Sequence, residues 1–193
     1  MFGRFAIYFA MLIVGLGIGG LVAWRMTGTV DRSAGEGPGP WRSQAGVGEG
    51  RATSFQRATI ARTGIWALPT SEVIYFIAEH DDDGQPLDAT CHYRLVANGE
   101  PDTRWWSINA YRDYFWIDNP IDRYSFTGTT VQYDALGGYV IDAAPEEVGT
   151  NWLPLSDTPG RLTFLFRLYQ PSPLMADNLG SVVLPKIERV TCE

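Results

Sequence analysis

The longest apolar run of the chain lies at its N-terminus. Residues 5–24 (FAIYFAMLIVGLGIGGLVAW) contain no charged side chain, and Arg4 and Arg25 flank them. At about 1.5 Å per residue, a helix of this length spans roughly the 30 Å hydrocarbon core of a bilayer. The pattern predicts a transmembrane anchor over residues 1–25. A cleaved signal peptide is the alternative, but the run is longer than a usual signal core and large residues precede the candidate cleavage sites.

Polar, glycine-rich sequence follows the anchor. Residues 26–50 contain seven Gly and two Pro, and such a stretch buries too little apolar surface to offset its ordering entropy. We therefore expect a flexible linker. Its one large apolar side chain, Trp41, either rests on lipid head groups or docks on the following domain. Apolar residues then recur at helical spacing over 52–68, up to Pro69, which predicts one helix packed against the start of the domain.

After this helix the apolar period changes to two, the period of a β-strand. The candidate strands are 72–79, 87–96, 104–111, 114–118, three short segments within 124–144, 162–170 and 182–190. Turn-forming residues separate them, and the chain's many Trp, Tyr and Phe residues favour strands. The pattern predicts a mainly β domain over residues 51–193, a jelly-roll-like β-sandwich preceded by the short helix.

Charge divides the chain in two. Residues 1–62 carry seven Arg against three acidic residues, which gives +4, and residues 63–193 carry eight basic against nineteen acidic residues, which gives −11. An acidic folded part repels phosphate backbones, which argues against nucleic acid as a partner. The basic part adjoins the predicted anchor, where Arg25 and Arg32 can approach anionic head groups.

The predicted anchor also suggests partners and an orientation. Gly15 and Gly19 form a small-xxx-small pair on one helix face, which permits close contact with a partner helix or a second copy of the chain. Glycine is also simply frequent in membrane helices. A short N-terminus ahead of a first apolar segment usually stays inside. We therefore predict a single-pass protein of the bacterial inner membrane with its domain in the periplasm.

The two cysteines fit an exported domain. In an oxidising compartment Cys91 and Cys192 are more readily bridged than free, and closing a loop of roughly 100 residues is worth a few kcal/mol. Two unrelated thiols are the alternative. A metal site has less support because His92 and His80 are the only histidines and no paired-cysteine motif occurs. We expect neither a metal nor a cofactor.

An acidic turn and a tryptophan pair carry candidate chemistry. Residues 79–84 (EHDDDG) resemble the first half of a calcium loop but lack its closing Glu, and a solvated hairpin turn accounts for them better. In the run Arg104-Trp105-Trp106, the two Trp side chains face opposite sides of a strand. One enters the core, and the other, beside Arg104, suits a sugar ring or a partner protein unless both faces are buried.

Polar loops supply the other candidates. Arg167 and Tyr169 share one strand face. A buried Arg167 needs either a carboxylate, which Asp118 or Asp122 can provide, or several carbonyl partners. The alternative is that these groups pin loops to the sandwich. The candidate ligand-binding residues are Arg104, Trp106, Asn119, Arg123, Tyr124, Asn151, Trp152, Arg167 and Tyr169.

Catalysis finds little support in the sequence. There is no nucleophile elbow, zinc-protease motif or phosphate-cradling glycine loop. We therefore predict a non-catalytic envelope protein that binds a partner or stabilises a membrane complex. The alternative is a jelly roll that binds, or acts on, carbohydrates or another small ligand.

Six segments together carry a resemblance to a known family. They are GIWALPTSEVIYF (64–76), DDDGQPLD (81–88), RWWSINAY (104–111), NPIDRYS (119–125), NWLP (151–154) and RLYQPSP (167–173). In this order they resemble the uncharacterised family catalogued as domain of unknown function 1214, which in longer proteins often follows a companion family numbered 1254. The resemblance implies a jelly-roll sandwich and leaves the activity open. The chain looks like a short version from Gram-negative bacteria, in which the anchor and linker replace the companion domain. The signature positions implied are Asn119, Arg123, Tyr124, Asn151, Trp152, Arg167 and Tyr169.

Overall fold

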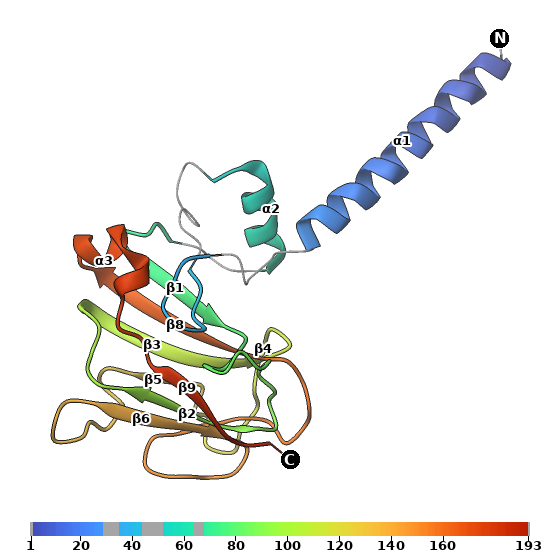
Figure 1. Cartoon of the computed structure of the whole chain (residues 1–193). Helices are drawn as coiled ribbons and strands as arrows, with labels where there is room; N and C mark the ends of the chain where they lie inside the picture. The colour runs from blue at the N-terminus through green and yellow to red at the C-terminus, as the bar shows by residue number, and fades with distance from the viewer. Residues whose placement is uncertain (1, 29–34, 44–51, 64–67, 193) are drawn as a thin grey trace. The chain divides into compact units, whose positions relative to one another are not determined.

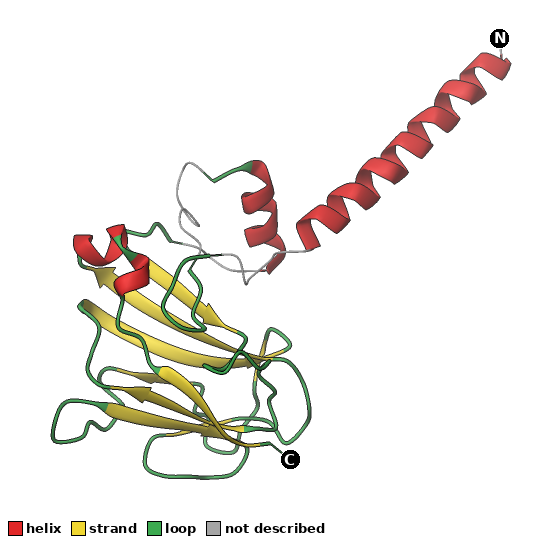
Figure 2. Cartoon of the chain, viewed as in Figure 1, coloured by secondary structure: helices red, strands yellow, loops and turns green. Residues whose placement is uncertain are grey.

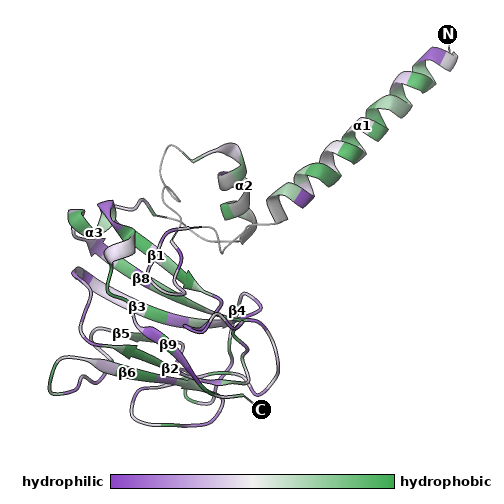
Figure 3. Cartoon of the chain, in the orientation of Figure 1, coloured by the Kyte–Doolittle hydropathy of each residue, from purple (hydrophilic) through white to green (hydrophobic). Residues whose placement is uncertain are grey.

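The computed structural model describes residues 2–28, 35–43, 52–63 and 68–192 (Figure 1). The chain divides into two compact units, residues 1–31 with 47–67 and residues 32–46 with 68–193. In the first unit, helix α1 (Phe2–Gly28) contains the apolar run, and its stretch Gly3–Met26 is long and apolar enough to cross a membrane. Figure 3 shows this apolar character along the helix. The N-terminal helix is thus a candidate single membrane span.

Helix α2 (Ser54–Thr63) lies within the range predicted as helical. It is shorter than the predicted helix 52–68, whose residues 64–67 are outside the described residues. Its packing against the start of the domain stays a prediction.

The second unit is a sandwich of two β-sheets, which Figure 2 shows as two yellow layers. The first sheet contains β1 (Val73–Ala78), β8 (Leu162–Pro171), β3 (Thr103–Arg112) and β4 (Phe115–Trp116) in that order, with β5 (Ser125–Thr127) also paired to β3. The second sheet contains β7 (Trp152–Pro154), β6 (Tyr139–Ala144), β2 (His92–Ala97) and β9 (Lys186–Thr191). The strands β1, β2 and β3 alternate between the two sheets, as successive strands do in a jelly roll. The predicted class, mainly β and sandwich-like behind a long N-terminal helix, is confirmed.

Some local predictions differ from the structure. The segment Asn151–Pro154, expected to be a loop, contains β7, because it pairs in parallel with β6 and its side chains are buried. Residues 130–135, one of the three segments within 124–144 expected to be strands, contain no strand. Asp134 instead begins a turn, in which its carboxylate accepts hydrogen bonds from the amides of Leu136 and Gly138. A short helix α3 (Pro173–Asp177) and a 3-10 turn η1 (Leu179–Ser181) follow β8 and were not predicted.

The core lies between the two sheets and is rich in aromatic side chains. Trp106 is stacked on Tyr139 of the opposite sheet and on Phe166 of its own sheet, with ring centroids 5.0 and 5.2 Å apart. Its indole Nε1 donates to Glu100 Oε1 at 3.3 Å, so its polar atom is satisfied. Alternate residues of β8, from Phe164 to Leu168, bury their side chains in this layer, as the period of two predicts.

Residues 35–43, which we call the strap, fold against the sandwich. Arg42 and Ile77 of β1 exchange two backbone hydrogen bonds of 2.8 and 2.9 Å. Trp41 is 1% exposed, and its Nε1 donates to Pro185 O at 2.7 Å. The expectation of a flexible linker over 26–50 is therefore wrong for the strap, and α1 extends through residues 26–28. Of the two predicted positions for Trp41, docking on the domain is the observed one.

The glycines of the strap are structural rather than flexible. Glu36 and Ser43 pair as a short hairpin, and a Cβ at Gly37 would lie 2.3 Å from Trp41 O. Gly39 has a φ of 55°, in the left-handed region that favours glycine. The composition that suggests a linker instead specifies a tight loop that inserts Trp41 between the sheets.

The predicted disulfide is present. Cys91, just before β2, is bonded to Cys192, just after β9, with their Cα atoms 4.2 Å apart. The bond fixes the end of the chain to the second sheet, where β9 is an edge strand.

Candidate functional site

The loop before β5 uses its signature residues to hold itself together. Asn119 Nδ2 donates to Ile117 O and Arg123 O at 3.1 and 3.0 Å, and Asn119 Oδ1 accepts from Arg123 N at 2.9 Å. The Arg123 guanidinium donates to Trp152 O at 3.1 Å and lies 5.1 Å from the Phe126 ring centroid. These contacts connect the loop to β7 in the other sheet.

Asn151 and Trp152 are buried and bonded within the protein. Asn151 Oδ1 accepts from Gln132 N at 2.8 Å, and its Nδ2 donates to Gln132 O and Val140 O at 2.9 Å each. Trp152 Nε1 donates to Ala144 O at 2.9 Å. The polar atoms of both side chains are occupied by backbone partners, so these two residues serve the fold.

Tyr124 lies at the edge of an aromatic group on the first sheet. Its ring meets Trp116 edge-on with centroids 5.5 Å apart, and its hydroxyl donates to Asp122 Oδ1 at 3.3 Å. Desolvation, together with the carboxylates of Asp122 and Asp118, raises the pKa of Tyr124 above its ordinary value. The hydroxyl therefore remains a neutral donor at physiological pH.

Arg167 does not have the carboxylate partner expected for it. Its guanidinium donates to Asn109 Oδ1 and, at 2.9 Å, to the hydroxyl of Tyr111. Neither Asp118 nor Asp122 is paired with it, because both lie in the loop around Tyr124 while Asn109 and Tyr111 of β3 are nearer on the same sheet face. Both observed partners are neutral, and the side chain is half-buried.

A groove on the first sheet brings together two of the predicted residues, Arg104 and Tyr169. It has a volume of about 270 Å³, and its lining residues are Leu68, Glu72, Val73, Arg104, Trp105, Tyr169 and Gln170. We call it the Trp105 groove. The rings of Trp105 and Tyr169 are tilted against each other with centroids 4.9 Å apart, and Trp105 is 37% exposed. The groove thus has an aromatic wall that solvent reaches.

Polar groups line the rim of the Trp105 groove. Arg104 donates to Gln170 Oε1 at 3.0 Å across the strand pair. Gln170 has a φ of 48°, an uncommon conformation for this residue type. Its backbone N–H donates to the backbone carbonyl of Glu72 at 2.7 Å. A strained residue in a concave site is an observation that supports a functional role. A guanidinium, an amide and a carboxylate beside an aromatic wall can bind hydroxyl groups around an apolar ring face.

The sequence identified this site only in part. Trp106, the predicted aromatic residue, lies in the core, while Trp105 lines the groove. The pairing of Trp105 with Tyr169 in the antiparallel register of β3 and β8 decides which tryptophan faces outward. Glu72 and Gln170 were missed, because their approach to Arg104 depends on that same register.

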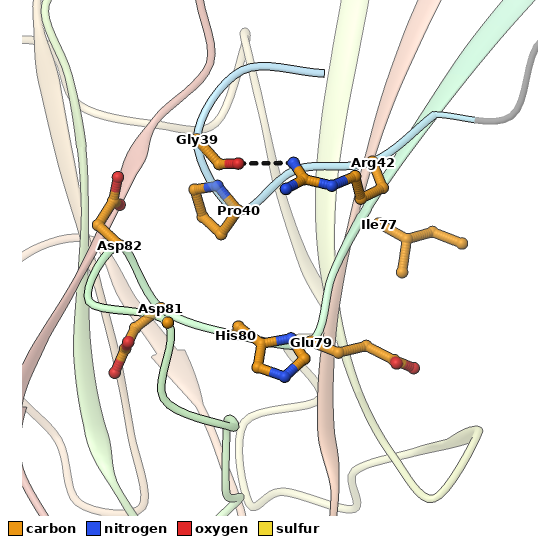
Figure 4. Close-up of a pocket in the computed structure, with 9 residues that line it drawn as sticks. Gly39, Pro40, Arg42, Ile77, Glu79, His80, Asp81 and Asp82 are labelled. Atoms are coloured by element: carbon orange, nitrogen blue, oxygen red, sulfur yellow. Dashed lines mark hydrogen bonds between the residues drawn. The ribbon is translucent and has the colours of Figure 1, made fainter. Parts of the chain in front are cut away.

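A second groove lies between the strap and the acidic turn. Gly39, Pro40 and Arg42 line one side and residues 79–82 the other, around a volume of 280 Å³ (Figure 4). The Arg42 guanidinium donates to the carbonyl oxygen of Gly39 at 2.6 Å. It therefore stabilises the loop of the strap.

The carboxylates of the acidic turn also serve the fold. Asp81 Oδ1 accepts from the amides of Asp83 and Gln85, and its Oδ2 pairs with Arg189 Nε at 2.8 Å. Asp82 Oδ2 accepts from the amide of Ile187. These bonds agree with the hairpin-turn interpretation of the segment. Among the described residues, no three His, Cys, Asp or Glu side chains are grouped so that they could hold a metal ion.

Another titratable cluster lies on the second sheet. His92 Nε2 and Arg94 Nε both contact Asp142 Oδ1, at 3.0 and 3.4 Å. The adjacent Cys91 is used in the disulfide. The cluster joins β2 to β6. It contains a carboxylate and an imidazole, but His92, Arg94, Asp142 and the bonded Cys91 do not include a free nucleophile.

The chain is similar to proteins of known structure. The crystal structure of the VPA0106 protein from Vibrio parahaemolyticus matches with a TM-score of 0.58 and 25% identity, over 74% of this chain and 36% of that one. An uncharacterised protein from Burkholderia cenocepacia matches with a TM-score of 0.45 and 15% identity, over 62% of this chain and 30% of that one. The chain thus spans about a third of the length of these proteins. No curated protein matches it. The model of the family described as protein of unknown function DUF1214 matches residues 72–173, just over half of the chain, and the chain therefore belongs to this family.

Proposed function

We propose that the chain is a non-catalytic binding protein of the bacterial cell envelope, held at the inner membrane by α1, whose sandwich binds a sugar ring in the Trp105 groove. The observation that carries the proposal is the solvent-exposed ring of Trp105 against Tyr169, with Arg104, Gln170 and Glu72 at the rim. A pyranose ring has apolar faces and polar edges, which match an aromatic wall with a polar rim.

The position in the cell is supported by two other features. Helix α1 is apolar and of spanning length. The disulfide between Cys91 and Cys192 favours an oxidising compartment, since cytosolic thiols are kept reduced. Together they support a periplasmic domain on an inner-membrane anchor.

The proposal is tested with the full chain in detergent and a neutral oligosaccharide, chitotetraose, as the probe. We expect saturable binding by calorimetry, weakened at least about tenfold (~1.4 kcal/mol) by Trp105→Ala because the stacking surface is lost. Phe115→Ala is the matched control, since this side chain is 75% exposed outside the groove. Equal binding by Trp105→Ala and the unaltered chain would refute the assignment of the groove.

Stabilisation of a membrane complex is a second candidate function, supported by the open face of α1. A Cβ at Gly15 or Gly19 would meet nothing within 4 Å, so a second helix can approach there. We expect cross-linking in membranes to capture a dimer or a partner helix, and Gly15→Leu with Gly19→Leu to abolish it. A monomer that cross-links to nothing, with or without these changes, would count against this function.

A further inference from the structure

We infer that the ligand of the Trp105 groove is an acidic oligosaccharide, and that Arg167 binds its carboxylate. The inference rests on the proposed function, because it extends the same site along the sheet. Arg167 and Tyr169 are two residues apart on β8 and face the same side, which places their Cα atoms roughly 7 Å apart. The groove wall formed by Tyr169 is therefore followed by Arg167 along the same face of β8.

The first argument is that the charge of Arg167 has no counter-ion among the residues that the structure describes. Its two hydrogen bonds go to the neutral groups of Asn109 and Tyr111. The ion pairs that join two described residues involve Arg94, Arg189 and His92, and none of them includes Arg167. Holding a half-buried cation beside neutral partners costs free energy that a bound anion would recover.

The second argument comes from the composition of the domain. In residues 63–193 acidic side chains outnumber basic ones by nineteen to eight. Carboxylates are therefore plentiful, and Arg94 and Arg189 both pair with one. The printed partners of the half-buried Arg112, Arg123 and Arg167 are neutral groups. Of these three, Arg167 is the one that follows Tyr169, a wall of the Trp105 groove, on the same strand.

The third argument is that the guanidinium is held in place before any ligand arrives. Asn109 is 4% exposed, and while its Oδ1 accepts from Arg167, its Nδ2 donates to Tyr124 O at 3.1 Å. Tyr111 is fixed in turn by Trp116, at a ring distance of 4.6 Å. Two of the five guanidinium donors bind the protein, so donors remain for a carboxylate. A preorganised fork of this kind is what carboxylate recognition uses.

The geometry also sets the length of the ligand. Asn109 is four residues beyond Trp105 on β3, roughly 13 Å along the strand. A single ring on Trp105 does not reach a guanidinium held by Asn109. The ligand therefore has several sugar units, with a neutral ring on Trp105 and an acidic one near Arg167.

The test compares two probes of equal length on the full chain in detergent. One is chitotetraose, which is neutral, and the other is the hyaluronan tetrasaccharide, in which N-acetylglucosamine alternates with glucuronate. We expect the acidic probe to bind at least about tenfold more tightly (~1.4 kcal/mol) and its advantage to fall as salt is raised. Arg167→Gln should remove the advantage and leave the affinity for chitotetraose unchanged, while Arg167→Lys should keep part of it.

Arg94→Gln is the matched control, because it removes one positive charge from the other sheet and should leave both affinities unchanged. Thermal melts of each variant separate lost binding from lost folding. A folded Arg167→Gln variant that retains the preference for the acidic probe overturns the inference and leaves the proposed function intact. Binding that depends on Arg167 but not on Trp105 overturns the sugar-ring proposal instead. Failure of the unaltered chain to bind either probe overturns both.

Discussion

The amide of Asn151 joins two segments that meet beside β6. It bonds the amide and carbonyl of Gln132 and the carbonyl of Val140 while 7% exposed. Asn151→Ala leaves three backbone groups without a partner, so we expect the free energy of unfolding to fall by about 3 kcal/mol in urea titrations. Asn98→Ala, at an exposed position, is the control and should change little. A small effect at Asn151 would mean that water replaces its bonds.

The single carboxylate of Asp88 makes a pH-dependent contribution to the stability of the fold. Its partial burial opposes ionisation, but hydrogen bonds from the hydroxyl and amide of Thr90 and the amide of Gly160, with the charge of Arg189, lower the pKa of Asp88 below 3.8. A carboxyl whose pKa is lower in the folded than in the unfolded state stabilises the folded state at pH values above its unfolded pKa. This stabilisation is lost as the pH falls through the folded-state pKa.

We therefore expect Asp88→Asn to be less stable than the unaltered chain at pH 7, with the difference shrinking below the ordinary pKa of 3.8. Urea unfolding at neutral and acid pH measures this convergence. Parallel curves for Asp88→Asn and the unaltered chain would contradict the assignment.

How far the sequence predicts the site is also decided residue by residue. Alternation showed that Trp105 and Trp106 face opposite sides, but only the pairing of β3 with β8 shows that Trp106 enters the core. Likewise, the sequence identified Arg167 and its need for a partner. That this partner is Asn109 and not an aspartate follows from the register of β3 against β8. A change of one residue in register exchanges the two faces, so no local pattern settles it.

At the scale of elements, the strands were predictable and the strap was not. Period-two alternation located β1, β3 and β8 to within a few residues, because their inner faces are apolar. The strap has the composition of a linker, since its glycines are needed for close approach rather than for flexibility. Its single tryptophan was the only signal of docking. The strap also lies outside the family match of 72–173, so the folded domain begins earlier than the family match.

The strap should therefore contribute to the stability of the sandwich. Trp41→Ala removes a fully buried indole and its bond to Pro185 O, and we expect a loss of about 3–5 kcal/mol in the free energy of unfolding. Gly37→Ala should also destabilise, because its Cβ would lie 2.3 Å from Trp41 O.

Gly99→Ala is the matched control for the strap substitution, since a Cβ there meets nothing within 4 Å. Urea titration of the full chain measures all three variants. If Trp41→Ala left the unfolding midpoint unchanged, the strap would be dispensable for the stability of the sandwich.

For the whole molecule, the disulfide connects stability with the side of the membrane on which the domain lies. It closes a loop across a sequence separation of 101 residues, and in the chain-entropy model a loop of this size is worth about 4–5 kcal/mol. Cys192→Ser should lower the melting temperature, and a reductant should lower that of the unaltered chain to the same value without affecting the variant. This matched response distinguishes the cross-link from any effect of the serine side chain.

The same bond reports the compartment. If the domain lies in the periplasm, chain taken from cells with an alkylating agent present and then denatured should show no free thiol, and should show two after reduction. A cytosolic domain would give two free thiols without reduction, because the cytosol keeps cysteines reduced. That result would mean that α1 has the opposite orientation and that envelope glycans cannot reach the Trp105 groove. The thiol count is therefore also a test of the proposed ligand.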